Sequence, residues 1–388
     1  MLRTTGGAVS RAAKAAGSRA VVAQGAPAAG TSWVQQQRWR SERHGPALRS
    51  GVSGLKATVF GAYGFLGRYV TARLGASSVQ CVVPFRGDDM EWRHLKPMAD
   101  YGSIVPMPFS PRDQDSLDRA IEGSDVVINL VGKEFDTTHY VPFLVNYSIW
   151  DTQVEVAERI AETAVKHGVT NLVHVSALAA DHGSSSEWAR AKAAGEEAVR
   201  SVAPGATIVR PADIFGPEDK FLNLFARMHY SLPRTLLVDG GKAFCQPVYC
   251  DDVAKAIHKI AMTNDPEVHL GQTYDLAGPD VYSYQEIVEH VFETVRAIEP
   301  HVANISPAVA DAVGRAFQLF PNPLLSADRL RRMCIDNTLD EAAATKRLHD
   351  LEIEATSMET PGFNFLWRFR SGGHFLDVHE VEGKAEYL

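Results

Sequence analysis

Apolar runs alternate with amphipathic stretches from Lys56 onward, and this alternation predicts the fold. Short continuous apolar runs, such as KATVF at residues 56–60 and VVINLV at residues 126–131, are typical of strands buried on both faces. The stretches between the strands repeat apolar positions at helical spacing. The pattern predicts an α/β fold, a Rossmann-type doubly wound parallel sheet with helices on both faces. We expect strands at residues 56–60, 79–85, 104–107, 126–131, 172–175 and 207–209, and helices at residues 64–74, 113–121, 148–167 and 187–199.

The alternation loosens beyond about residue 210, where a smaller C-terminal α/β lobe is expected. Helices are predicted over residues 221–229, over residues 251–262 with Asp251 as N-cap, and from the capping box Ser283-x-x-Glu286 to about residue 298. Residues 301–388 yield no assignment. The predicted organisation is a nucleotide-binding Rossmann domain at residues 52–215, a smaller lobe at 216–300 completed by returning segments, and a docking region at 301–388.

The first expected strand runs directly into a glycine-rich turn, GAYGFLG. The first glycine allows a tight turn, the second lets the backbone approach a pyrophosphate, and the third lets the helix pack closely on the sheet. The turn follows a strand and opens a helix, which is the context in which such a motif binds a dinucleotide. A tight turn without a ligand is the alternative. The residues predicted to contact the cofactor are Gly61, Tyr63, Gly64, Phe65, Leu66 and Gly67.

The residue after the second strand decides between NAD and NADP. Arg86 lies 19 residues beyond Gly67, and its guanidinium suits the 2′-phosphate of NADP(H). Asp88 and Asp89 follow and would suit NAD, and a solvated surface arginine is the simpler reading. We predict NADPH. Asn129 and Gly132, at the end of the fourth strand, are further candidate cofactor contacts, unless they only turn the chain.

The GxxGxxG spacing resembles that of the extended and atypical short-chain dehydrogenase/reductase (SDR) families. In a working member a serine orients the substrate carbonyl, and a Tyr-x-x-x-Lys pair supplies the proton. This sequence has Ser176 at the expected strand end, but Trp188 stands in place of the tyrosine, four residues before Lys192. An indole N–H does not titrate usefully, so Ser176 and Lys192 are predicted to bind the cofactor in a degenerate, non-catalytic site.

Other residues near the site could replace the missing tyrosine. Tyr63, His174 and His182 are the candidates that could supply a proton instead. We expect His174, which lies within a predicted strand, to be a packed histidine rather than a catalyst.

Charge divides the chain, whose formal net charge is −8. Residues 1–50 carry eight basic residues and one acid, and the remaining 338 carry 31 basic against 46 acidic residues, a net −15. The head is rich in Ala, Ser, Thr and Arg, which is typical of a mitochondrial transit peptide, predicted at residues 1–40; a disordered basic tail is the alternative. The acidic body argues against nucleic-acid binding.

The four cysteines form no CxxC pair and no disulfide framework, so no metal site is predicted. Reduced thiols fit the cytosol or an organelle matrix. No apolar stretch approaches the roughly 18–20 residues of a membrane span.

Three further segments narrow the resemblance: ADIFGPED at residues 212–219, QPVY at 246–249 and YDLAGP at 274–279. With the glycine turn, they resemble the SDR-like accessory subunits of mitochondrial respiratory complex I, the NADH:ubiquinone oxidoreductase, over about residues 52–279. The resemblance implies a tightly held NADPH outside the electron path, a position on the matrix side of the inner membrane, other complex I subunits as partners, and a role in assembly and stability at the junction with the membrane arm.

Two other functions stay open at this point. One is a free organellar NADP-dependent reductase or epimerase of the SDR type, and the other is an NADPH-sensing regulatory protein. The apolar and aromatic stretches at residues 307–325 and 363–370 are candidates for contact with partner subunits or a lipid surface, with packing inside the chain's own lobe as the alternative.

Overall fold

A computed structural model describes residues 53–136, 147–263, 266–297, 301–318, 323–340 and 343–370. The transit peptide predicted at residues 1–40 lies outside these ranges. The centre of the fold is a seven-stranded sheet in which every neighbouring pair is parallel, in the order β11-β6-β5-β4-β1-β2-β3. The strands are β1 (Lys56–Phe60), β2 (Gln80–Phe85), β3 (Ile104–Pro108), β4 (Val126–Asn129), β5 (Asn171–Val175), β6 (Thr207–Pro211) and β11 (Thr273–Leu276).

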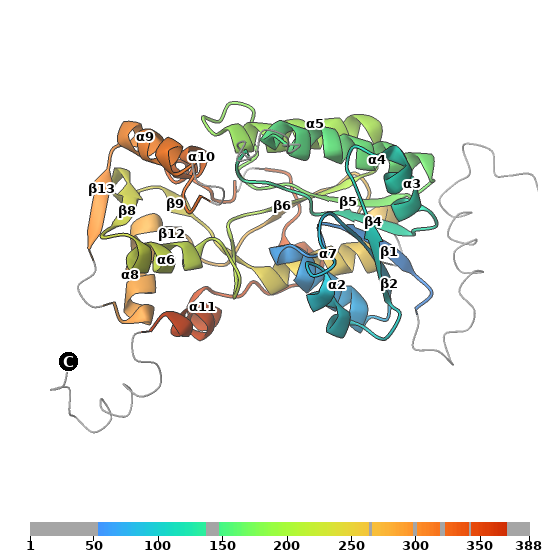
Figure 1. Cartoon of the computed structure of the whole chain (residues 1–388), viewed down its shortest axis with the longest axis horizontal. Helices are drawn as coiled ribbons and strands as arrows, with labels where there is room; N and C mark the ends of the chain where they lie inside the picture. Colours follow the sequence, from blue (N-terminus) through green and yellow to red (C-terminus); the bar gives the residue numbers. More distant parts are fainter. Residues whose placement is uncertain are drawn as a thin grey trace, which may run out of the picture. The chain divides into compact units, whose positions relative to one another are not determined.

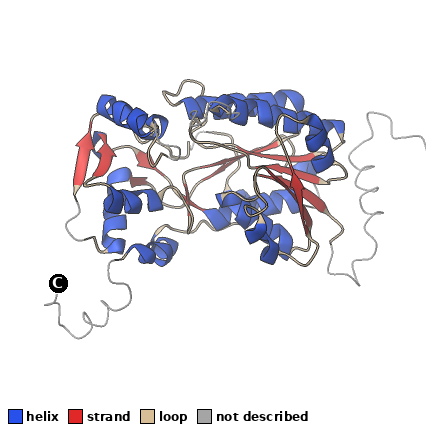
Figure 2. Ribbon diagram, viewed as in Figure 1, coloured by secondary structure: helices blue, strands red, loops and turns tan. Residues whose placement is uncertain are grey.

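Helices cover both faces of this sheet (Figures 1 and 2). Apolar side chains of α2 and α7 share one core with the sheet, and those of α3, α4 and α5 share another with its opposite face. This is the doubly wound arrangement that the sequence predicts. The helices are α2 (Phe65–Ala76), α3 (Gln114–Ile121), α4 (Val156–Lys166) with a π-helical turn η2 before it (Asp151–Glu155), α5 (Glu187–Val202) and α7 (Cys250–Met262).

A second group of elements surrounds its own apolar core, to the left in Figure 1. Its helices are α6 (Leu222–Ser231), α8 (Tyr284–Val295), α9 (Pro307–Phe317), α10 (Ala327–Arg332) and α11 (Glu359–Leu366). Its strands pair in twos: β7 (Ile214–Phe215) with β10 (Val248–Tyr249), β9 (Phe244–Cys245) with β12 (Tyr282–Ser283), and β8 (Thr235–Val238) with β13 (Val302–Ile305). Short helical turns are η1 (Arg93–Met98), η3 (Asp239–Gly241), η4 (Pro266–Val268), η5 (Leu348–Leu351) and η6 (Trp367–Phe369).

Each predicted strand and helix is present in the structure, but several of them begin or end at different residues than predicted. The capping box is present, since the Ser283 side chain accepts from the Glu286 N–H and the Glu286 side chain accepts from the Ser283 N–H. The helix it opens ends at Val295 rather than near residue 298. Asp251 is not the N-cap of α7: Tyr249 holds that position, and the Asp251 carboxylate pairs instead with Arg73 at 2.6 Å.

The segment after residue 301 is built into both cores. Leu325, Leu330 and Leu366 are buried in the second core, whereas Leu348 and Leu351 are buried against the Rossmann sheet. Strand β11 likewise comes from the 216–300 segment and completes the main sheet beside β6. Returning segments therefore join the two parts of the fold. Among the described residues, no helix has the length and apolar character needed to cross a membrane.

Candidate functional site

The glycine turn between β1 and α2 has the geometry that its sequence requires. Gly61 has a φ of +78°, and a Cβ there would lie 3.0 Å from the carbonyl oxygen of Leu130. A Cβ on Gly67 would lie 2.3 Å from the Gly61 oxygen, so only glycine lets α2 start this close to the sheet. Gly64 is the N-cap of α2 and provides no side-chain cap. The N–H groups of the first helical turn are therefore available for an anion.

The turn opens onto a cavity of about 470 Å³. Gly64 and Phe65 line it from one side, and Gly132 and Ser176 line it from the ends of neighbouring strands. Leu66 does not reach the cavity wall and packs instead against the Rossmann core, as does Tyr63. Burial raises the pKa of Tyr63, so its phenol is a poorer proton donor than usual.

Arg86 lies directly after β2, at the carboxyl edge of the sheet, and is exposed. Its guanidinium carbon lies 4.8 Å from the ring centroid of Tyr147, and that of Arg112 lies 4.5 Å from the same centroid. The Asp89 carboxylate accepts from the Trp92 indole at 3.4 Å. Arg86 thus follows the second strand, the position that decides between NAD and NADP in a Rossmann fold, and it shares the Tyr147 ring with Arg112.

Asn129 uses its side chain to hold the chain rather than to face the cavity. Its Oδ1 accepts a hydrogen bond from the Val131 N–H at 3.0 Å. Strand β4 therefore ends before residue 131, which the sequence predicts as its last residue. The Nδ2 of Asn129 therefore donates to Nδ1 of His174 at 3.1 Å. Burial and nearby Lys192 lower the pKa of His174 to about 3, so this histidine is a neutral, packed strand residue.

Ser176 and Gly132 line the cavity, and the buried Lys192 lies beside Gly132 without lining the cavity itself. The Oγ of Ser176 is buried and has no hydrogen-bond partner among the described residues. Lys192 Nζ donates to the Val175 carbonyl at 3.1 Å, and a Cβ built on Gly132 would lie 3.6 Å from that Nζ. Burial lowers the pKa of Lys192 to about 8.

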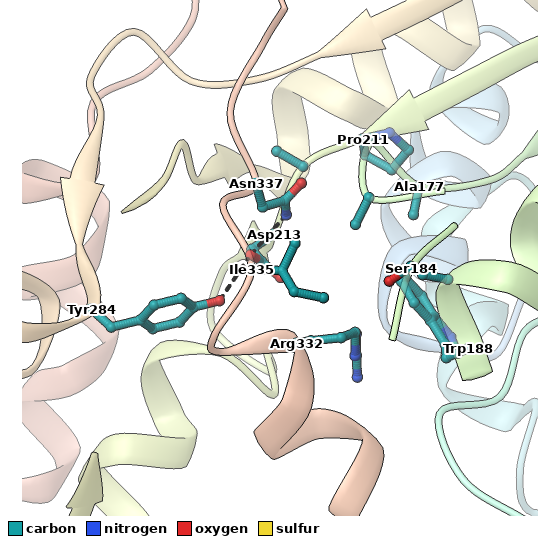
Figure 3. A pocket seen from close by; sticks show the side chains of 12 residues that line it. Ala177, Ser184, Trp188, Pro211, Asp213, Tyr284, Arg332, Ile335 and Asn337 are labelled. Atoms are coloured by element: carbon teal, nitrogen blue, oxygen red, sulfur yellow. Dashed lines mark hydrogen bonds between the residues drawn. The ribbon is translucent and has the colours of Figure 1, made fainter. Parts of the chain in front are cut away.

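Trp188, which the sequence predicts to replace the tyrosine of a short-chain dehydrogenase, lines the cavity. The Arg332 guanidinium lies 4.2 Å from its ring centroid (Figure 3). Lys192 Nζ lies 5.9 Å from the same centroid. The alternative proton donors are elsewhere: His182 pairs with Glu197 at 3.2 Å, and neither His182, Tyr63 nor His174 lines this cavity.

The second core adds residues to the cavity that the sequence patterns missed. Asp213 accepts from Tyr284 at 3.5 Å and from Asn337 at 2.9 Å, in a small adjoining space of about 40 Å³ (Figure 3). Arg329 and Arg332 reach the cavity from α10. The sequence signal for Arg329 and Arg332 is the basic run after Asp328. No periodicity in this run indicates which of its side chains face the cavity. Within the described ranges, no three His, Cys, Asp or Glu side chains gather as metal ligands.

Comparison with known proteins identifies the family to which this chain belongs. The NAD dependent epimerase/dehydratase family matches residues 57–277. A relative from Arabidopsis thaliana, "NADH dehydrogenase [ubiquinone] 1 alpha subcomplex subunit 9, mitochondrial", is 39% identical over 85% of this chain and 82% of its own length. The mouse protein of that name is 38% identical over 84% of each chain. The chain belongs to this subunit 9 family, within the epimerase/dehydratase family. The resemblance that the sequence motifs predict is confirmed.

Other relatives agree with this assignment. The "NADH-ubiquinone oxidoreductase 40 kDa subunit, mitochondrial" of Neurospora crassa is 35% identical over 84% of this chain and 83% of its own. Among solved structures, NADPH-dependent quinone oxidoreductase QOR2 from Escherichia coli in complex with NADPH has a TM-score of 0.58 at 17% identity, over 80% of this chain and 99% of that one. MoeE5 in complex with UDP-glucose and NAD also has a TM-score of 0.58 at 17% identity, over 81% and 99%. These structures confirm the fold class predicted for the subunit 9 family chain.

Proposed function

We propose that the chain is an accessory subunit of mitochondrial complex I that binds NADPH as a structural group and does not turn it over. The observation that carries this proposal is the set of residues that line the cavity. Gly64, Phe65, Gly132 and Ser176 line the cavity, which supports dinucleotide binding, and Trp188, with the Arg332 guanidinium over its ring, offers no titrating group for proton transfer.

The residues present fit a dinucleotide. The Gly61–Gly67 turn is held tight because a Cβ on Gly61 or Gly67 would meet backbone atoms, the first turn of α2 has no side-chain cap, and the buried Ser176 Oγ lacks a partner among the described residues. A phosphate on the helix N-terminus and ribose or amide groups at Ser176 and Lys192 would satisfy these groups. NADPH, when bound, brings a hydride donor. The chain's own residues would bind and orient it, and the indole of Trp188, at the position predicted for the missing tyrosine, does not exchange a proton near neutral pH.

NADPH is favoured over NADH by Arg86, with Arg112 as its neighbour on Tyr147. A 2′-phosphate carries two further negative charges and suits paired guanidinium groups. The Asn129 side chain does not bind the nucleotide directly in this proposal, because it already makes hydrogen bonds to the Val131 N–H and to His174. Gly132 contributes by leaving room beside Lys192.

The compartment and partners follow from the relatives. Their names assign them to the mitochondrion and to NADH:ubiquinone oxidoreductase, and the basic, acid-poor head of this chain supports import. We place the chain on the matrix side of the inner membrane, among other complex I subunits. The half-exposed Phe363 on α11 supports a further contact with a subunit or a lipid surface.

Two measurements test this function. Native gel electrophoresis of mitochondrial membranes should show the chain migrating with complex I; a purely soluble small species would contradict the assignment to the complex. Mass spectrometry of nucleotide released from the native protein should find NADPH. A purified chain that oxidises NADPH with a carbonyl substrate would instead support the free-reductase alternative.

A further inference from the structure

Helix α10 is attached to the beginning of α5 by one buried carboxylate. Asp328 is 6% exposed; its Oδ1 accepts from the Glu187 backbone N–H at 2.7 Å and its Oδ2 accepts from the Ser186 hydroxyl at 2.8 Å. Ser186 itself caps α5 by accepting from the Ala189 N–H at 3.3 Å. A carboxylate at a helix N-terminus also interacts favourably with the helix dipole.

One turn further along α10, Arg332 makes a second contact with the same part of α5. Its guanidinium lies over the ring of Trp188, and its Nε lies 3.8 Å from the Asp328 carboxylate. Residues four apart lie on one face of a helix, so Asp328 and Arg332 present a single face of α10 to the first turn of α5 (Figure 3 shows the Arg332 end).

The contact between α10 and α5 forms part of the wall of the dinucleotide cavity. Arg332 and Met333 line the cavity together with Gly132, Ser176 and Trp188. Helix α5 also carries Lys192, whose Nζ lies beside Gly132 of the cavity wall and donates to the Val175 carbonyl. A nicotinamide end held at Ser176 and Lys192 would therefore lie beneath α10.

We infer that Asp328 and Arg332 form a latch that retains the bound dinucleotide, which leaves only after α10 separates from α5. The inference rests on the proposed nucleotide binding and explains why that nucleotide would stay bound. Arg332 covers one face of Trp188 in the cavity wall, so breaking this contact would open the cavity and speed nucleotide release. Both residues are positioning residues and perform no chemistry.

The far side of α10 supplies a matched control. Asp311 of α9 pairs with Arg331 of α10 and with Arg315 at 2.8 Å, and it does not contact α5. Helices α9 and α10 also pack closely, since a Cβ on Gly314 would lie 2.4 Å from the Ala327 Cα. Removing the Asp311 carboxylate therefore disturbs α10 without opening the cavity wall.

The test measures how fast NADPH leaves the full chain. Wild type and the variants Asp328→Ala, Arg332→Gln and Asp311→Asn are loaded with NADPH and mixed with excess NADP⁺, and the fluorescence of bound NADPH is followed. Release should be at least about tenfold faster in Asp328→Ala, which loses two charge-assisted hydrogen bonds. Arg332→Gln should also accelerate release, and Asp311→Asn should stay within about twofold of wild type.

Each outcome bears on a distinct claim. Wild-type release rates in Asp328→Ala and Arg332→Gln, or equal acceleration in Asp311→Asn, would overturn the latch. If Asp328→Ala does not fold, Arg332→Gln alone decides, because it keeps both hydrogen bonds of Asp328 to α5 and removes the Arg332 contact with Trp188 and the ion pair with Asp328. A wild-type chain that holds no NADPH contradicts the proposed function, and the latch with it.

Discussion

Lys192 is a cation that the fold buries almost completely, although the tyrosine it would serve is absent. Its side chain is 6% exposed, and its Nζ has one carbonyl partner at 3.1 Å. Burying a charge with so few partners costs stability, and the lowering of its pKa to about 8 reflects that cost. A chain that needed no ligand here would gain by replacing the lysine. Its presence therefore supports nucleotide binding as the remaining task of the site.

The pKa of Lys192 predicts a specific pH dependence of folding. The unfolded chain keeps the Lys192 proton up to its ordinary pKa of 10.5, whereas the folded chain releases it near pH 8. The unfolded state thus binds more protons between these values, and the free energy of unfolding gains a contribution that rises with pH. Relative to Lys192→Met, the nucleotide-free wild type should gain about 2 kcal/mol between pH 8 and 10, as measured by urea unfolding.

Subtracting the free energy of unfolding of the variant from that of wild type removes the contribution of the other titrating groups. Lys166→Met is the control, since Lys166 is 61% exposed and pairs with Asp118 at the surface. Its difference from wild type should not change over this pH range. A constant difference for Lys192→Met as well would show that Lys192 keeps its ordinary pKa.

Reversing the charge of Arg86 should separate the two nicotinamide dinucleotides. Arg86→Glu places a carboxylate where the 2′-phosphate is proposed to bind, and we expect NADPH affinity to fall at least about tenfold while NADH affinity changes less than about threefold. Isothermal titration with each nucleotide measures both. Arg119→Glu makes the same charge change on the exposed face of α3 and should alter neither. Equal losses of NADPH and NADH in Arg86→Glu would rule out the phosphate role.

At the scale of elements, the sequence predicts best where one local pattern determines one structure. The buried strands and the glycine turn are of this kind, because strand burial shows as an apolar run and each glycine answers a local steric need. Strand β11, with only four residues and an aspartate in the middle, carries no such pattern and was not predicted. Helix α10 is six residues long and mostly charged, and its burial comes from pairing with a distant helix. Contacts of this kind, such as Arg332 on Trp188, leave no periodic signal.

The β1–α2 turn allows its packing and binding roles to be tested separately. Gly67→Ala would place a Cβ 2.3 Å from a backbone oxygen, so the start of α2 must move, and we expect a loss of several kcal/mol in the free energy of unfolding, roughly 3 kcal/mol. Gly64→Ala meets only the Gly61 oxygen, at 3.2 Å, and Gly64 has an ordinary negative φ. Its cost to folding should be under about 1.5 kcal/mol.

Nucleotide binding is the second measurement on this pair. Gly64 lines the cavity, so Gly64→Ala should weaken NADPH binding while the chain remains folded. Thermal unfolding with and without NADPH reports both effects, because a ligand that binds the native state raises the unfolding midpoint. A Gly64→Ala chain stabilised by NADPH as strongly as wild type would contradict a close approach of the phosphate to this turn.

At the scale of the whole molecule, the chain after residue 300 joins the two cores. It adds strand β13 to β8, places α10 against α5, and returns residues 348–353 to the Rossmann sheet before α11 packs on the second core. A region predicted as a docking appendage thus also completes the fold. Any surface it offers to partners is held rigidly relative to the nucleotide cavity, through the same helix that covers that cavity.

Truncation tests whether this segment is part of the folding unit. A chain ending at residue 300 loses the buried apolar side chains Leu325, Leu330, Met333, Leu348, Leu351, Ile353, Met358, Phe365 and Leu366. At roughly 1.5–3 kcal/mol for each, the summed loss is about 14–27 kcal/mol, which matches or exceeds the roughly 5–15 kcal/mol by which domains are typically stable. The truncated chain should therefore be insoluble or lack a cooperative unfolding transition. A chain ending at residue 370 keeps every contact named above and should unfold cooperatively and bind NADPH. Cooperative unfolding of the chain that ends at 300 would mean that the Rossmann sheet folds without the returning segment, and that the latch is an addition to a complete domain.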